Sequence, residues 1–242
     1  MRLLRTGAAG DAGAGRPDLA FSVSAVIIDL DGTLLDTVAD LTAAVAAMLR
    51  EIGRAPIPED RVARYIGKGA EVLVHRAVTD SVDGLLPEAE FERAIESFRR
   101  HYARENGLSA RVYPGVIEGL ERMRVMGLRL AVVTNKPEAF TVPLLERTGL
   151  LHHFELVVGG DTLPRRKPDP MQMLHVCARF GISPERVVAI GDSVNDALAA
   201  RAAGMPVFAV PYGYNEGADV RTLDVDAIVD SLFDATALIE CA

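Results

Sequence analysis

VSAVIIDLDGTLLDT, at residues 23–37, is the stretch that decides the fold. Its first eight residues, VSAVIIDL, are apolar and rich in branched side chains, which is typical of a strand buried on both faces. Similar runs follow along the chain, the last of them weaker, at residues 128–134, 154–158, 187–190, 206–210 and 227–229. We therefore expect a sheet whose strands lie inside the molecule.

Helical patterns lie between these runs, and their ends carry helix start and stop signals. Three segments begin at a proline (114–127, 137–149 and 170–181), and a fourth follows Asp192-Ser193 and ends at Gly204. Proline just inside the start and glycine just past the end is the usual asymmetry of a helix. Strands that alternate with helices of about 10–15 residues predict an α/β fold with a doubly wound, mostly parallel sheet.

One segment between the first and second strands does not alternate. Residues 37–108 show helical periodicity and no convincing strand. Because roughly 70 residues is too long for a simple crossover, we predict an inserted helical subdomain. The expected organisation is a core of residues 21–36 and 109–242, a helical cap of residues 37–108, and a flexible leader of residues 1–20 outside the fold.

The composition limits the class of protein. Among 242 residues, 26 Lys and Arg face 34 Asp and Glu, which gives a net charge of −8 and makes nucleic acid a poor partner. The two cysteines, Cys177 and Cys241, predict reduced thiols and a cytoplasmic location. No apolar run has the length of a membrane span, so we expect no membrane partner. The oligomeric state is left open.

Polar side chains lie at or just after the ends of four successive predicted strands. In open parallel sheets, ligands bind outside the carboxyl ends of the strands, so these side chains should meet at one edge. In chain order they are Asp29, Asp31, Thr134, Asn135, Lys167, Asp192 and Asp196. Each aspartate alone is most simply a turn former or a helix N-cap. Together, however, the carboxylates would repel one another unless a hard cation such as Mg²⁺ lay among them.

A magnesium site of this kind indicates phosphoryl chemistry. A carboxylate beside the metal can attack phosphorus and form an acyl phosphate. If the chain turns at Gly32, both Asp29 and Asp31 reach the pocket, one for the attack and the other for proton transfer. Thr134 and Lys167 would hold the phosphoryl oxygens. The expected partner is therefore a small phosphorylated metabolite.

Four segments carry a resemblance to a known family. They are DLDGTLLDT at 29–37, VVTNK at 132–136, RKPDP at 166–170 and GDSVND at 191–196. In order and spacing they resemble the four motifs of the haloacid-dehalogenase-like hydrolases, and the resemblance runs from Val23 to the C-terminus. It implies a Rossmann-like core with an inserted all-helical cap after the first motif.

The resemblance also implies roles for individual residues. Asp29 would be the nucleophile and Asp31 the acid and base. Magnesium would be held by the Asp29 side chain, the Asp31 backbone carbonyl and Asp192, with Asp196 in support. Thr134 and Lys167 would bind phosphate, with Asn135 nearby. Asp31 separates the sequence from the dehalogenases and the phosphonoacetaldehyde hydrolases, which lack this second aspartate, so the reaction is expected to be hydrolysis or transfer of a phosphoryl group.

The substrate must be chosen by the cap. Further stretches resemble the bacterial phosphoglycolate phosphatases: VVTNKP at 132–137, GGDTLPRRKPDP at 159–170, AARAAGM at 199–205 and VPYGYNEG at 210–217. The expected substrate is therefore 2-phosphoglycolate. Lys68, in the glycine-rich stretch YIGKG at 65–69, is a candidate partner of the glycolate carboxylate, although a solvated lysine in a turn is an equal interpretation. The pair Arg165 and Arg166 has no assigned role, because most basic pairs are solvated.

Three alternatives stay open. The same chemistry could act on a sugar phosphate, pyrophosphate or a nucleotide. A phosphomutase of the β-phosphoglucomutase type would share the core and return the phosphoryl group to a sugar. A non-catalytic binding module would retain the fold alone, and the complete set of aspartates, Thr134 and Lys167 speaks against it.

Overall fold

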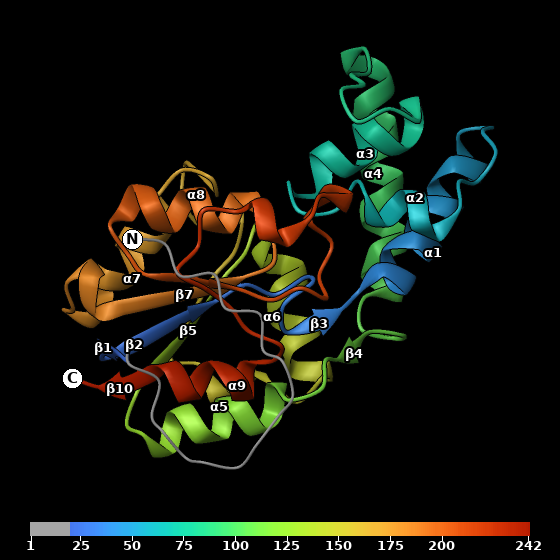
Figure 1. Ribbon diagram of the computed structural model, residues 1–242. Coiled ribbons are helices and arrows are strands. Elements are labelled where there is room, and N and C mark those ends of the chain that lie inside the picture. Colours follow the sequence, from blue (N-terminus) through green and yellow to red (C-terminus); the bar gives the residue numbers. More distant parts are fainter. Residues whose placement is uncertain (1–19) are drawn as a thin grey trace.

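The computed structural model describes residues 20–242, so the predicted leader lies outside the described residues except for Ala20. At the centre is a six-stranded sheet in which every neighbouring pair is parallel (Figure 1). In sheet order its strands are β6 (Leu156–Val158), β5 (Arg129–Val133), β2 (Ala25–Ile28), β7 (Val187–Gly191), β8 (Val207–Ala209) and β9 (Ala227–Ile228). All six were expected from the sequence, and the predicted fold class is confirmed.

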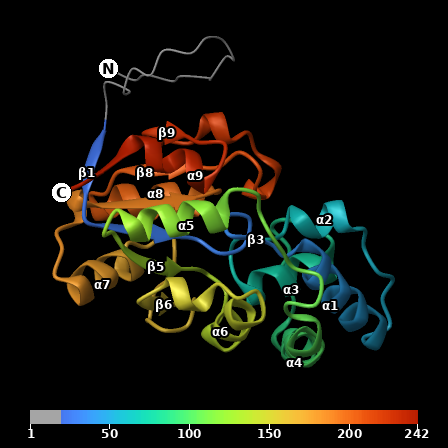
Figure 2. The same cartoon turned by 90° about the horizontal axis from the view of Figure 1, so that it is seen from below.

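Helices cover both faces of this sheet, as Figures 1 and 2 show. One face packs against α5 (Val116–Val125), α6 (Glu138–Arg147) and α9 (Leu232–Ala235), and the other against α7 (Met171–Phe180) and α8 (Val194–Ala203). The strands serve both cores by alternation. In β2, Val26 and Ile28 belong to the first core, and Ala25 and Ile27 to the second. A strand buried on both faces has no polar side, which is why its sequence is continuously apolar.

The helix ends agree with the sequence signals. Gly181 follows α7 and Gly204 follows α8, and both adopt the left-handed conformation that ends a helix. Helix α8 begins with a capping box, in which the Ser193 and Asp196 side chains each accept a hydrogen bond from the other's backbone N–H. The box fixes Asp196 in the first turn, directly after the end of β7.

Two small sheets were not predicted. β1 (Phe21–Val23) pairs in parallel with β10 (Ile239–Cys241), and β3 (Leu35–Asp36) pairs antiparallel with β4 (Arg111–Val112). Elements of two or three residues are too short to show a period of two. The β3–β4 pair joins the two segments that connect the core to the inserted helices.

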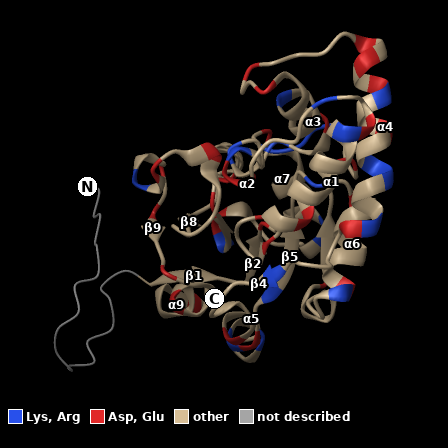
Figure 3. Cartoon of the chain, turned by 90° about the vertical axis from the view of Figure 1, so that its right-hand side faces the viewer, with Lys and Arg blue, Asp and Glu red and all other residues tan. Residues whose placement is uncertain are grey.

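The inserted helices are α1 (Val38–Glu51), α2 (Glu59–Ala63), α3 (Ala70–Thr79) and α4 (Glu88–Glu105). They stand beside one end of the sheet (Figure 1) and have a core of their own, to which α4 contributes Ala94, Ile95, Phe98 and Tyr102. Charges of both signs line the outer part of α4, as Figure 3 shows. The helix is therefore amphipathic, with its apolar stripe toward the core of the inserted helices.

The remaining described elements are five short 3₁₀ helices, at Leu151–His153, Pro184–Arg186, Asn215–Gly217, Val220–Thr222 and Thr236–Leu238. Within residues 20–242, no helix is long and apolar enough to cross a membrane. Cys177 is buried, Cys241 is exposed, and both are free thiols. The cytoplasmic location stays a prediction.

Candidate active site

The site begins where β2 ends. The Asp29 backbone N–H donates to the Ile190 carbonyl at 3.0 Å, so Asp29 is still held against β7 as the strand finishes. The chain then turns at Gly32, which has a φ of +87°. A Cβ atom there would lie 2.4 Å from Asp192 Oδ2, so only glycine allows this turn to pass so close to the carboxylate.

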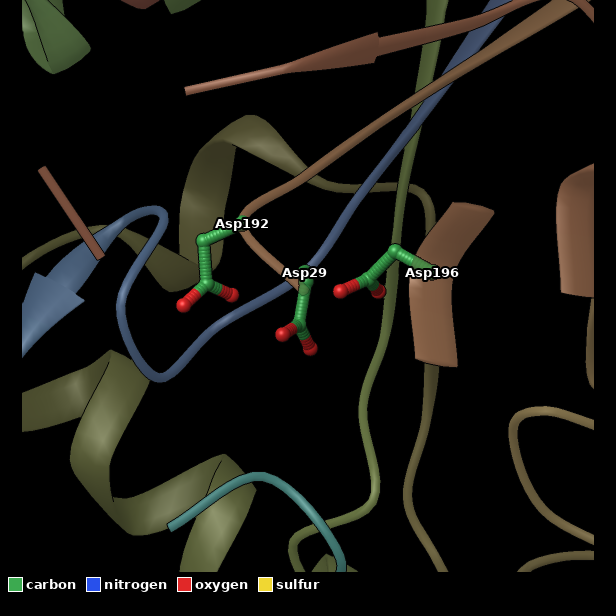
Figure 4. A group of neighbouring side chains, drawn as sticks. All are labelled: Asp29, Asp192 and Asp196. Carbon is green, nitrogen blue, oxygen red and sulfur yellow. The ribbon is translucent and has the colours of Figure 1, made fainter. Parts of the chain in front are cut away.

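Three carboxylates converge at this point. Asp29, Asp192 and Asp196 each offer one oxygen, and these oxygens lie within 4.8 Å of one another. Figure 4 shows the Asp29 carboxylate between the other two. Asp192 Oδ2 accepts a hydrogen bond of 2.6 Å from the Tyr214 backbone N–H, and Asp196 Oδ2 accepts one of 2.6 Å from Ser193 Oγ. Their positions are therefore set by the surrounding chain.

The electrostatics of this group favour a bound cation. Burial raises the pKa of Asp29 to about 7, with Lys167 opposing the shift and Asp196 adding to it. Burial also raises the pKa of Asp192 well above its usual value, and the carboxylates of Asp196 and Asp29 add to the rise. A divalent cation would remove the repulsion that causes part of both shifts. The oxygen-only donor set suits Mg²⁺, so these residues fit the predicted metal.

Lys167 holds two of the three carboxylates. Its ammonium lies 2.7 Å from both Asp29 Oδ1 and Asp196 Oδ1, and it donates to the Val133 carbonyl at 2.8 Å. The approach to Asp29 is close but poorly directed for a hydrogen bond. Burial lowers the pKa of Lys167, yet Asp196 and Asp29 outweigh burial and raise it, so the side chain stays charged. All three of its N–H groups have a neighbour.

Asp31 lies beside this group with a different set of partners. Its Oδ1 accepts a 2.6 Å hydrogen bond from Thr37 Oγ1 and lies 3.0 Å from Lys136 Nζ. The Asp31 side chain is 13% exposed, close to the value of 11% for Asp29. Asp31 therefore reaches the same pocket as Asp29 but stands outside the three-carboxylate group.

Thr134 and Asn135 follow β5 and are both buried. Thr134 Oγ1 accepts from the Lys136 backbone N–H at 3.2 Å. Asn135 Nδ2 donates to the Gly67 carbonyl at 2.9 Å and to the Lys167 carbonyl at 3.0 Å. Asn135 therefore connects the core to a backbone carbonyl of the inserted helical segment.

A cavity of about 480 Å³, part of it open to solvent, lies between the core and the inserted helices. The core contributes Asp29, Asp31, Thr134, Asn135, Lys136, Pro137 and Phe140, and the helical insertion contributes Leu41, Ile66, Gly67, Gly69, Ala70, Leu73, Phe98 and Tyr102. The structure thus brings Asp29, Asp31, Thr134 and Asn135 to one wall, with Lys167, Asp192 and Asp196 behind Asp29.

Lys68 is not among the residues that line this cavity. Its ammonium lies 3.0 Å from Glu216 Oε1 and 3.1 Å from Oε2 of the same carboxylate. Glu216 also accepts a 2.6 Å hydrogen bond from the buried Arg76 guanidinium. Glu216 belongs to the segment after β8, and Lys68 and Arg76 to the helical insertion, so the three form a polar contact between the two regions.

Arg165 and Arg166, the basic pair beside Lys167, also lie outside the cavity lining. Arg165 pairs with Asp169 at 3.1 Å, and Arg166 with Glu71 of α3 at 2.8 Å. Arg166 is a second connection between the core and the helical insertion.

Comparisons with known proteins identify the class. The sequence pattern of the haloacid dehalogenase-like hydrolases matches residues 23–204. The chain is 54% identical to a phosphoglycolate phosphatase of Nitrosospira multiformis and 50% identical to one of Thiobacillus denitrificans, in each case over 90% of this chain and 96% of the relative. The chain therefore belongs to the haloacid dehalogenase-like hydrolases.

A solved structure agrees with this assignment. The crystal structure of a predicted phosphoglycolate phosphatase from Haemophilus somnus superimposes with a TM-score of 0.83 at 35% identity, over 88% of this chain and 96% of that one. The similarity thus extends through the core and the inserted helices.

Two polar side chains of the cavity lining, Lys136 and Tyr102, had no predicted role. Lys136 stands in the quoted stretch VVTNK, and Tyr102 in the periodic pattern of the fourth inserted helix, yet nothing in either pattern shows that they meet. The Lys136 ammonium donates to Tyr102 Oη at 2.7 Å. Only the seating of α4 on the core brings them together.

Proposed function

We propose that the protein hydrolyses 2-phosphoglycolate to glycolate and phosphate through an aspartyl-phosphate on Asp29, with Mg²⁺ as cofactor. The observation that carries this proposal is the position of Asp29, which borders the cavity on one side and lies among Asp192, Asp196 and Lys167 on the other. The names of the Nitrosospira and Thiobacillus relatives support the choice of substrate.

In the first half-reaction, an Asp29 carboxylate oxygen attacks phosphorus while the bond between phosphorus and the ester oxygen breaks. Asp31 gives a proton to the departing oxygen, so that glycolate leaves as an alcohol. In the second half-reaction, water attacks the phosphorus of the aspartyl-phosphate. Asp31 accepts the proton of that water, and phosphate and free Asp29 result.

The other site residues hold the phosphoryl group and the metal. Thr134 and Lys167 stabilise the phosphoryl oxygens, with Asn135 beside them. The Asp29 side chain, the Asp31 backbone carbonyl and Asp192 would hold Mg²⁺, with Asp196 in support. The ion would supply a positive charge that offsets the charge on the phosphoryl oxygens.

The helices of residues 37–108 act in this proposal as a cap. It opens to admit substrate and closes to exclude water during the first half-reaction. Hinges near residues 34–37 and 108–114 would allow this, since both connections and the short β3–β4 pair lie there. Structures without ligand and with a phosphate analogue would test this motion, and identical cap positions in both would contradict it.

The proposal is tested by a panel of phosphate monoesters assayed with Mg²⁺. We expect the highest kcat/KM for 2-phosphoglycolate and release of free phosphate. A higher kcat/KM for a hexose phosphate, pyrophosphate or a nucleotide would contradict 2-phosphoglycolate as the substrate and leave the proposed phosphatase mechanism unchanged. An isomerised sugar phosphate as product would instead identify a mutase. No turnover of any ester would favour a binding module.

A further inference from the structure

The proposed substrate carries a carboxylate as well as a phosphoryl group, and the cavity must bind both; the inference rests on that proposed function. Among the residues that line the cavity, the charged ones are Asp29, Asp31 and Lys136. Lys136 is therefore the single cation of this lining. Burying the substrate's carboxylate here without a positive partner would be costly.

Lys136 still has a donor to offer. Its side chain is only 4% exposed, and its ammonium has two partners among the described residues, Asp31 Oδ1 at 3.0 Å and Tyr102 Oη at 2.7 Å. An ammonium has three N–H groups. One N–H of a buried cation is thus left for a ligand in the cavity.

The other nearby cations are committed elsewhere. Lys167 lies behind Asp29, is assigned to the phosphoryl oxygens and does not line the cavity. Lys68 and Arg166 pair with Glu216 and Glu71, and neither lines the cavity. The sequence suggested Lys68 as the partner of the carboxylate, but Lys136 lines the cavity and Lys68 does not.

We propose that Lys136 is the specificity-determining residue that binds the carboxylate of the substrate, and that Tyr102 of the cap orients it. The position of Asp31 limits how far the carboxylate of the substrate can lie from its ester oxygen. Asp31 must reach the ester oxygen, and Lys136 Nζ is 3.0 Å from Asp31 Oδ1. Lys136 then reaches a group only a few bonds from that oxygen. The substrate class is esters whose carboxylate sits on the carbon that bears the phosphoryl oxygen.

The cap completes this subsite. Tyr102 packs against Phe98 at 5.4 Å and against Phe140 of the core at 4.9 Å between ring centroids, and Lys136 Nζ lies 4.8 Å from the centre of the Tyr102 ring. These apolar walls exclude water, which strengthens a contact between two charges. Because Tyr102 belongs to α4, the subsite exists only when the cap is seated on the core.

The test compares kcat/KM for 2-phosphoglycolate with that for ethyl phosphate, which lacks the carboxylate, in the wild type, Lys136→Met and Lys68→Met. A buried charge-assisted contact corresponds to roughly 10- to 150-fold in kcat/KM. We expect Lys136→Met to reduce the ratio of the two values by this factor and Lys68→Met to leave the ratio unchanged. Any effect of Lys136 on the chemistry through Asp31 acts on both esters and cancels in the ratio.

A second variant covers a loss of folding in Lys136→Met. Tyr102→Phe keeps the ring and removes the hydroxyl, and the loss of one hydrogen bond should lower the ratio by about fivefold. The wild type gives a further check, because 3-phosphooxypropionate, with its carboxylate one carbon farther away, should be hydrolysed less efficiently than 2-phosphoglycolate.

The outcomes separate the two proposals. A wild type that does not prefer 2-phosphoglycolate over ethyl phosphate contradicts the proposed substrate. The role of Lys136 alone is overturned if the wild type has that preference and both Lys136→Met and Tyr102→Phe keep the wild-type ratio. It is likewise overturned if Lys68→Met abolishes the preference for 2-phosphoglycolate.

Discussion

The two walls of the cavity are built from different chemistry. The core wall carries Asp29, Asp31 and Lys136, with Lys167 and two further carboxylates behind it. The cap wall is apolar apart from glycine backbone and the Tyr102 hydroxyl, and it includes Leu41, Ile66, Leu73 and Phe98. The core thus supplies charge, whereas the cap supplies an environment in which that charge acts strongly.

This contrast assigns separate tasks to the two regions. The groups proposed to make and break bonds, Asp29 and Asp31, lie at the end of a parallel strand, where the backbone holds their side chains in defined positions. Selection belongs to the contact between cap and core, where Lys136 meets Tyr102. Substitutions at Asp29 and Asp31 should therefore lower turnover of every ester, and substitutions at Lys136 or Tyr102 should change which ester is preferred.

The largest effect is expected at the nucleophile. In Asp29→Asn an amide replaces the attacking carboxylate, so kcat should fall by about a thousandfold or more for every ester. Steady-state assays on several esters measure this loss. Asp83→Asn, at an exposed aspartate outside the cavity lining, is the matched control and should keep wild-type kcat. Near-normal turnover in Asp29→Asn would refute covalent catalysis at this residue.

Removal of the metal should have an effect of similar size. The three converging carboxylates predict that EDTA abolishes activity and that added Mg²⁺ restores it. Calcium should inhibit, because its larger and looser coordination shell would misplace the attacking oxygen. Titration of chelated enzyme with each ion measures both effects. Full activity after chelation would show that the core wall works without a cation.

Stability should depend on pH in a way that Mg²⁺ changes. The pKa of Asp29 is raised from 3.8 to about 7, so between these values the metal-free folded state holds more protons than the unfolded chain. The free energy of unfolding should therefore fall as pH rises through this range. Bound Mg²⁺ favours the ionised carboxylates, so its stabilising effect should grow with pH.

Melting temperatures at pH 5 and pH 8, with and without Mg²⁺, measure this. Burial lowers the pKa of His153, and this histidine contributes a slope of opposite sign that is equal with and without the ion. It cancels in the comparison. Stabilisation by Mg²⁺ that is equal at both pH values would contradict the assigned carboxylate site.

The smallest effects are expected at the polar contact between cap and core. Glu216→Gln leaves the Arg76 guanidinium, whose side chain is 4% exposed, without its carboxylate, which should cost about 1–3 kcal/mol of stability. Lys68→Met removes the partner that is 37% exposed and should cost about 0–1 kcal/mol. Urea unfolding of the wild type and both variants measures the two losses in the free energy of unfolding. Equal losses would mean that Lys68, not Arg76, carries the contact.

The core wall was largely predictable from the sequence. Asp29 and Thr134 lie at the ends of predicted strands, Lys167 and Asp192 follow such strands, and the topology of a parallel sheet brings these positions to one edge whatever the details of packing. The convergence of Asp196 with Asp29 and Asp192 was expected for the same reason. Local sequence signals were sufficient here because each residue is placed by its own strand or helix.

The contacts of the cap were not predictable in the same way. Tyr102 lies 34 residues before Lys136 and Lys68 lies 148 residues before Glu216, so both pairs depend on how the helices rest on the core. Periodicity identifies Tyr102 as a residue of the cap core and gives no sign that its hydroxyl reaches the active site. A glycine-rich loop with one lysine likewise does not show which carboxylate that lysine meets.

The central claim is that the phosphoryl group passes through Asp29. Enzyme with Mg²⁺ and 2-phosphoglycolate can be quenched in acid within milliseconds, digested and analysed by mass spectrometry. We expect a phosphorylated peptide that contains residues 23–37, with the acyl phosphate on Asp29 and convertible to homoserine at that position by borohydride. Rapid turnover with no phosphorylated peptide, or with the phosphoryl group on another residue, would contradict the account.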